Sequence, residues 1–151
     1  MRFIFPLMFV TTIFFAQLEG AIAAGDLTKQ EPFELHVSLG NEKGEIKFFP
    51  NKLQLETGKL YKLILTNNSP QKHYFSSDKF SQSVFTRKVQ INSSNGTPIA
   101  EIKGSIREIE VYPGRTAEWW FVPLKTGILD DLMCTIPGHS EAGMMGVIEI
   151  K

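Results

Sequence analysis

One short stretch of the chain concentrates side chains that bind soft metal ions. Cys134, His139 and Met144 follow one another at intervals of five residues. A step of five turns an α-helix by about 500° and leaves successive side chains about 140° apart, and on a strand an odd step places them on opposite faces. The three side chains therefore converge only from a compact loop, for which Pro137–Gly138 and Gly143 supply the chain reversals.

The donor types indicate which metal such a loop would hold. Thiolate and thioether sulfur are soft donors, and two His with one Cys and a weak axial Met make the blue-copper arrangement. Zinc prefers four strong ligands, and Met is not a usual one. The chain has one cysteine, Cys134, which excludes a two-copper centre with bridging thiolates. The alternative for this residue is a buried, unreactive thiol packed as a small hydrophobe.

The loop supplies one histidine, so the second must come from elsewhere, and only His36 and His73 remain. His36 alternates with apolar neighbours along an expected strand and is expected to face solvent. His73 follows a polar loop at the edge of the expected sheet, where it can meet the other loop. We therefore predict that one copper ion, as Cu(I) or Cu(II), binds His73 and the loop, with Met144 or Met145 as the axial donor.

The elements that must position these residues are short β-strands. Phe33, Leu35 and Val37 alternate with polar residues, which is typical of a half-buried strand. Further strand candidates, separated by turn residues, are 46–49, 53–55, 60–65, 88–91, 99–102, 106–111, 116–122 and 146–151, and one more ends at Cys134. This spacing is typical of an all-β sandwich or barrel. Residues 76–85 are the exception and are predicted to form a short helix or flap, capped by Ser76 or Ser77, with Phe80, Val84 and Phe85 on one face.

Residues 1–24 have the features of a secretory signal peptide. A positive start is followed by an apolar run from Phe3 to Ala16 and by Ala21–Ala23, a small-x-small cleavage pattern. The alternative is a membrane anchor, but the run is shorter than the roughly 20 residues that span a bilayer. We expect export to the periplasm, a mature chain that begins at Ala24 or Gly25 without a membrane anchor, and a single domain over residues 25–151.

Charge gives the protein no electrostatic reason to bind nucleic acid or an anionic membrane. The sequence has 16 Lys and Arg against 16 Asp and Glu and no dense basic run. We expect a monomer that binds neither.

The residues around the loop resemble those of the cupredoxins. Cys134–His139 resembles the copper loop of azurin, and His139–Gly146 resembles that of plastocyanin and related bacterial cupredoxins. Upstream, the stretch from Phe49-Pro50 to His73-Tyr74-Phe75 resembles the first-ligand region of the family. The resemblance covers nearly all of the mature chain and implies a Greek-key β-sandwich.

The resemblance also implies roles for individual residues. His73, Cys134 and His139 match the equatorial ligands, and the spacing from His139 favours Met144 over Met145 as the axial ligand. In the family, the loop histidine serves as an electron port within an apolar patch, here expected at Ile136, Pro137 and Met145.

Three positions depart from the family pattern. Tyr74 stands where azurin and plastocyanin have an Asn, and Lys72 stands where azurin has a Gly, which favours a four-coordinate site. Asp130–Asp131 occupy the strand before the cysteine, where an aromatic is usual. This acidic pair is expected to be a solvated strand edge or bulge, with partner docking as the alternative. Trp119 and Trp120 face opposite ways on a strand, so at least one is expected in the core rather than in an electron relay.

The resemblance implies a mononuclear one-electron carrier between redox partner proteins. The alternative is a periplasmic copper-handling protein that carries or buffers the ion. Catalysis by a Cys-His nucleophile is a third hypothesis, but the loop also presents a Met that has no role in that chemistry. Multicopper enzymes need more histidines than the three present. We therefore expect no enzymatic activity.

Overall fold

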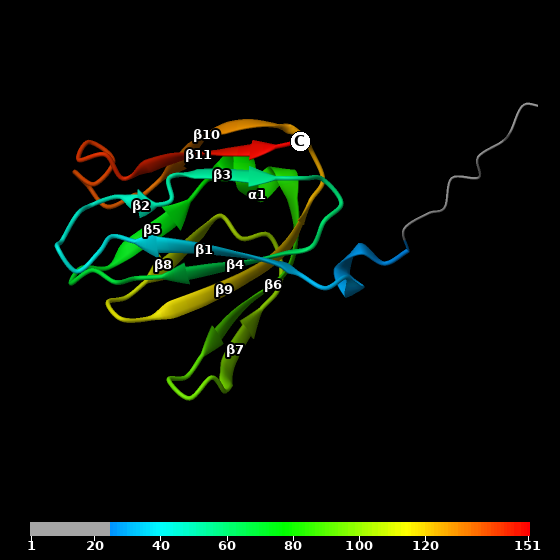
Figure 1. The fold of residues 1–151 in the computed structure, drawn as a ribbon, viewed down its shortest axis with the longest axis horizontal. Coiled ribbons are helices and arrows are strands. Elements are labelled where there is room, and N and C mark those ends of the chain that lie inside the picture. The colour runs from blue at the N-terminus through cyan, green and yellow to red at the C-terminus, as the bar shows by residue number, and fades with distance from the viewer. Residues whose placement is uncertain (1–24) are drawn as a thin grey trace, which may run out of the picture.

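A computed structural model describes residues 25–151, which form two β-sheets packed face to face (Figure 1). The predicted signal peptide, residues 1–24, lies outside the described residues. Between residues 25 and 151, no helix has the length and apolar character needed to cross a membrane. The two sheets confirm the prediction of an all-β sandwich.

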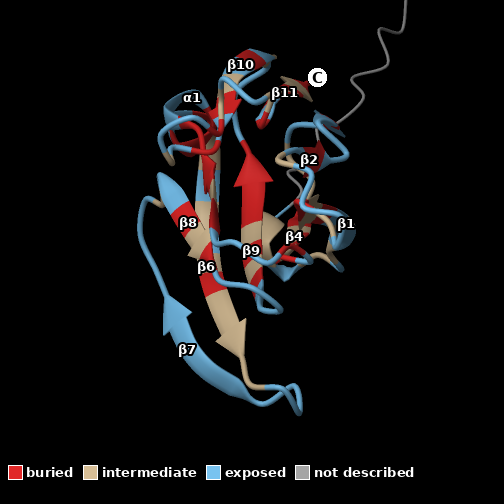
Figure 2. Ribbon diagram, turned by 90° about the vertical axis from the view of Figure 1, so that its left-hand side faces the viewer, coloured by how far each residue is buried: buried red, intermediate tan, exposed pale blue. Residues whose placement is uncertain are grey.

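The first sheet has six strands in the order β2-β1-β4-β9-β6-β7. They are β1 (Phe33–Leu39), β2 (Phe48–Phe49), β4 (Tyr61–Thr66), β6 (Val84–Asn92), β7 (Pro98–Ile102) and β9 (Thr116–Pro123). β1 and β4 run parallel, with Phe33 opposite Tyr61, and the other neighbours are antiparallel. The hairpin of β6 and β7 extends beyond the sandwich, and every residue of β7 is exposed (Figure 2).

The second sheet has five strands in the order β3-β11-β10-β5-β8. They are β3 (Lys52–Leu55), β5 (His73–Ser76), β8 (Glu108–Val111), β10 (Gly127–Met133) and β11 (Met145–Ile150). β11 runs parallel to β3 and antiparallel to β10, and β5 lies between β10 and β8. Because β5 is antiparallel to β10, the first residues of β5 and the last of β10 lie at the same end of the sandwich.

Aromatic side chains fill the space between the sheets. Phe80 lies edge-on to Trp119 and to Phe121, with ring centroids 5.1 and 4.9 Å apart, and Phe75 lies edge-on to Trp119 at 6.4 Å. Each fully buried aromatic of this kind contributes about 1.5–3 kcal/mol by leaving water. Trp119 is buried whereas Trp120 is only partly so, as expected for adjacent strand residues.

The short helix α1 (Asp78–Ser83) lies where the sequence predicts one. Ser77 is its N-cap, and its side chain accepts a hydrogen bond from the Phe80 N–H. The helix is shorter than predicted: Val84 and Phe85 already belong to β6, and Phe85 is exposed rather than on a buried helical face. Strand pairing with β9 therefore outweighs the helical pattern at these two positions.

The acidic pair before the cysteine lies in a strand irregularity and contacts α1. Between Leu129 and Leu132 the register of β10 against β11 shifts by one residue, as in a β-bulge. Asp131 accepts hydrogen bonds from the Ser77 hydroxyl at 2.5 Å and from the Lys79 N–H at 2.8 Å. The carboxylate therefore ties the start of α1 to β10.

A further helical element precedes the sheets. A single turn of 3-10 helix (Leu27–Lys29) is capped by Asp26, whose side chain accepts a hydrogen bond from the Thr28 N–H.

Candidate metal centre

Two segments of the second sheet bring the predicted ligands together. His73 is the first residue of β5, Cys134 follows the last residue of β10, and His139 and Met144 lie in the loop between β10 and β11. This loop, orange to red in Figure 1, lies at the end of the sandwich where β5 begins. The pairing of Met133 with Ser76 places β5 beside the end of β10.

Three donor atoms form a small triangle. The Nδ1 atoms of His73 and His139 are 3.2 Å apart, and Cys134 Sγ lies 3.4 Å from His139 Nδ1 and 3.9 Å from His73 Nδ1. Nitrogen and sulfur ligands at bond lengths of about 2.0–2.3 Å in a trigonal plane are about 3.5–3.8 Å apart. The triangle thus has the size that a first-row metal ion requires. Among residues 25–151 it is the one cluster of His, Cys, Asp or Glu with this convergence.

Burial of the donor residues favours the uncharged form of His73, which can bind a metal. The three residues are buried, and desolvation, followed by repulsion from His139, lowers the pKa of His73 from 6.5 to about 4. His73 is therefore neutral at pH 7, and an imidazole nitrogen keeps a free lone pair. Cys134 is a free cysteine with no exposed surface.

Backbone hydrogen bonds define the loop that carries three of the predicted ligands. The Cys134 N–H donates to the Met144 carbonyl at 3.0 Å, and the Met144 N–H donates to the His139 carbonyl at 2.9 Å. Gly138 and Gly143 have φ values of 86° and 102°, which only glycine adopts readily. The compact loop predicted from the five-residue spacing is thus confirmed.

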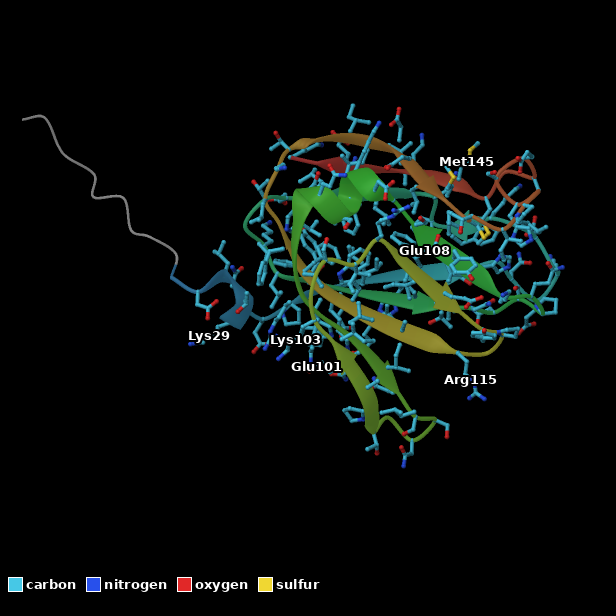
Figure 3. All side chains as sticks on the ribbon, turned by 180° about the vertical axis from the view of Figure 1, so that it is seen from behind. Lys29, Glu101, Lys103, Glu108, Arg115 and Met145 are labelled. Carbon is cyan, nitrogen blue, oxygen red and sulfur yellow. The ribbon has the colours of Figure 1, made fainter. Side chains whose placement is uncertain are left out.

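The two candidate axial residues lie on opposite sides of the sheet. Met144 is fully buried and belongs to the hydrophobic core, whereas Met145 is 51% exposed and projects outward from β11 (Figure 3). Burial therefore places Met144, and not Met145, on the inner side, where the donor triangle lies.

Neighbouring groups hold the ligands in place. The Tyr74 N–H donates to Cys134 Sγ at 3.3 Å, so the strand that carries His73 also contacts the sulfur. Gly40, in the turn after β1, packs against His73: a Cβ atom there would lie 3.1 Å from His73 Nε2 and 2.7 Å from the Ser69 Cβ. Its φ of 72° also favours glycine. Nothing in the local sequence marks Gly40 as a neighbour of His73.

Asn67 fixes the loop before His73. This residue is fully buried, and its Nδ2 donates to the carbonyls of Gln71 and Val111, both at 2.7 Å. Its Oδ1 accepts from the Ser69 N–H at 2.9 Å. The sequence predicts only a polar loop here, because the pattern does not show that one of its amides is buried.

The remaining residues singled out in the sequence lie around the donor cluster or away from it. His36 is exposed, with its Nε2 atom 3.7 Å from the Glu34 carboxylate, and lies outside the donor cluster. Lys72 forms an ion pair with Glu110 at 2.8 Å. Of the predicted apolar patch, Pro137 and Met145 are exposed and Ile136 is half-buried.

No protein-family model matches the sequence, and no curated protein matches it. Solved structures do match. Auracyanin A, a "blue" copper protein from Chloroflexus aurantiacus, is 17% identical, with a TM-score of 0.50 over 80% of this chain and 100% of that chain. Reduced auracyanin from Roseiflexus castenholzii is 15% identical, with a TM-score of 0.50 over 78% and 96% of the two chains. The chain has the cupredoxin fold. The multicopper oxidase McoA from Aquifex aeolicus also matches, at 17% identity and with a TM-score of 0.57 over 80% of this chain and 29% of that chain.

The donor set of this cupredoxin-like chain suits one metal in particular. Two imidazoles and one cysteine sulfur in a triangle, with a buried Met in the same loop, fit a single type 1 copper site. Hard cations such as Mg²⁺ and Ca²⁺ require oxygen ligands, which the cluster lacks.

Proposed function

We propose that this protein is an exported one-electron carrier that binds one copper ion through His73, Cys134, His139 and Met144. The observation that carries the proposal is the buried triangle of two imidazole nitrogens and one thiol sulfur. When bound there, copper supplies a Cu(I)/Cu(II) couple to which the protein adds a fixed set of soft and borderline donors.

The protein's contribution is rigidity. The donors already lie at metal-binding separations in the fold, and Asn67 and Gly40 hold the segment that carries His73. A site whose ligands do not move between oxidation states lets an electron pass with little rearrangement. The N–H that Tyr74 donates to Cys134 Sγ stabilises negative charge on the sulfur.

The surface beside the centre suits brief contact with redox partner proteins. His139 is 8% exposed, the most accessible of the four proposed ligands. Pro137 and Met145 are exposed close to it along the chain and offer apolar side chains to a partner protein. His139 is therefore the proposed electron port.

An electron carrier is favoured over an oxidase and over a copper buffer. A multicopper oxidase needs further copper centres, whereas residues 25–151 contain one convergent group of three or more His, Cys, Asp or Glu residues. A buffer must release its ion readily, whereas the proposed ligands are buried and held by hydrogen bonds from several segments.

Copper titration of the mature chain tests the proposal. An intense blue absorption band that saturates at one copper per chain is expected, because it reports a copper–thiolate bond. Cys134→Ser should abolish the band, and the matched control His36→Asn should leave it unchanged. Copper binding without the band would refute the proposed ligand set and favour copper handling.

Cyclic voltammetry then separates the two functions. A carrier should cycle reversibly and keep its copper in the presence of a chelator in both oxidation states. Loss of copper on reduction would support copper handling instead.

A further inference from the structure

Every sulfur atom of residues 25–151 lies where β10 leads through the loop into β11. The four residues are Met133, Cys134, Met144 and Met145. Elsewhere in the described chain, exposed apolar strand positions carry other side chains, such as Ile128 on β10 itself and Ile99 on β7. Within residues 25–151 methionine therefore occurs only in this region, where Met144 is buried and Met133 and Met145 are exposed.

The four residues form two pairs, one at the base of the loop and one across strands β10 and β11. Cys134 and Met144 are joined by a backbone hydrogen bond, and neither has any exposed surface. The next pair outward from the loop is Met133 opposite Met145, with exposed fractions of 36% and 51%. Because side chains alternate along strands, the first pair faces the core and the second faces solvent. Figure 3 shows Met145 projecting from the outer face.

The register of the outer pair allows its two sulfur atoms to meet at one point. Residues directly opposite each other on antiparallel strands have Cβ atoms about 4.5–5.5 Å apart. Methionine is unbranched and flexible, so both thioethers of Met133 and Met145 can turn toward one point between them. Two neutral thioethers select Cu(I) over harder and more highly charged ions.

We propose that Met133 and Met145 form a surface site for Cu(I), and that an ion captured there passes to the candidate centre. Binding at the surface is independent of the proposed function, whereas the transfer rests on it. The copper remains Cu(I) throughout. Two thioether bonds break as bonds to the buried donors form, and the proton of the Cys134 thiol passes to water.

The receiving centre is buried but reaches the surface at one ligand. His139 is more exposed than the other three proposed ligands and belongs to the loop that begins and ends beside the methionine pair. An ion at Met133 and Met145 is therefore already next to the segment through which the centre opens to solvent.

Silver titration tests the surface site. Ag(I) is a soft, redox-inert substitute for Cu(I), and the Cys134→Ser variant lacks the strongest buried donor. With carbon-13 in the methionine methyl groups, the signals of Met133 and Met145 should shift together in proportion to Ag(I), and Met133→Leu should abolish the shift at Met145. A shift of Met144 alone, or independent shifts of Met133 and Met145, would overturn the site.

A second form of the experiment does not depend on the folding of Cys134→Ser. Wild-type protein carrying one equivalent of Cu(I) should show the same paired shift of Met133 and Met145 on addition of one equivalent of Ag(I). If neither signal moves, the proposal is wrong.

Loading kinetics test the transfer. Leucine preserves the apolar contact area but removes the sulfur, so the double variant Met133→Leu, Met145→Leu isolates the thioether chemistry. It should acquire Cu(I) several-fold more slowly than wild type and reach the same endpoint, while the exposed control Ile128→Leu should load at the wild-type rate. Equal rates for all three proteins would refute the transfer.

The silver titrations and the copper titration separate this inference from the proposed function. If wild type forms no blue centre after oxidation, the proposed function fails. The paired silver shift still decides whether the surface site exists.

Discussion

Lowering the pH should destabilise the metal-free protein through His73. Burial, with a smaller effect of His139, lowers the pKa of His73 in the fold from 6.5 to about 4. Between these two values the unfolded chain binds a proton at this residue and the folded chain does not. Protons therefore favour unfolding, so stability is complete above about pH 6.5 and declines as the pH falls toward 4.

The size of the effect follows from the two pKa values. A difference of one pKa unit corresponds to about 1.4 kcal/mol, so the shift from 6.5 to about 4 amounts to about 3 kcal/mol. Most of this is lost by pH 4.5, before the folded-state pKa is reached. Domains of this size are stable by about 5–15 kcal/mol, so this loss is a large fraction of the total. A loss of this size should lower the melting temperature by roughly 10 °C.

Urea unfolding of metal-free protein at several pH values from 7 to 4.5 measures this change. His73→Asn removes the titrating group and should flatten the profile, apart from the contribution of carboxylates. His36→Asn removes an exposed histidine outside the cluster and should keep the wild-type decline. If His73→Asn lost as much stability as wild type over this range, the assignment of the effect to His73 would be refuted.

Two further substitutions test the supports of the centre. Gly40→Ala should cost about 1–2 kcal/mol from its positive φ alone, and should also weaken copper binding because its Cβ would crowd His73 Nε2. Gly44→Ala, with a similar φ of 77° and no atom within 4 Å of the new Cβ, should cost stability in thermal melts but leave the copper titration unchanged. Asp131→Asn should destabilise the fold by about 1–2 kcal/mol in urea unfolding, because its carboxylate accepts two hydrogen bonds at the start of α1. Asp130→Asn, which loses only an exposed ion pair with Lys79, should change stability by less than about 1 kcal/mol. Equal losses for the two variants would contradict the role of Asp131 in tying the start of α1 to β10.

The loop could be predicted from the sequence because the residues that determine its shape lie close together in the chain. The spacing of Cys134, His139 and Met144 excludes regular structure, and Gly138 and Gly143 occupy the positions of positive φ. The structure contains the predicted compact loop, because so short a segment with this spacing has few other conformations that bring the side chains together.

Features that depend on distant contacts were harder to predict. The strand β5 is only four residues long, and His73 is the first of them, so no alternation is visible there. The burial of Asn67 depends on the carbonyl of Val111, 44 residues away. Asp131 meets α1 because a register shift redirects β10, and such irregularities leave no clear pattern in one sequence.

The candidate centre also has an order of assembly. His73 and Cys134 are 61 positions apart in the sequence. Strand β3 pairs with β11, which lies about 95 residues later in the chain. The complete donor set therefore exists only once β5 has docked beside the loop that carries Cys134, His139 and Met144. Long-range strand pairing is slow because the intervening chain must first be ordered. Binding of copper by all the proposed ligands at once therefore requires the folded sheet, and a variant that folds slowly leaves its thiol open to oxidation for longer.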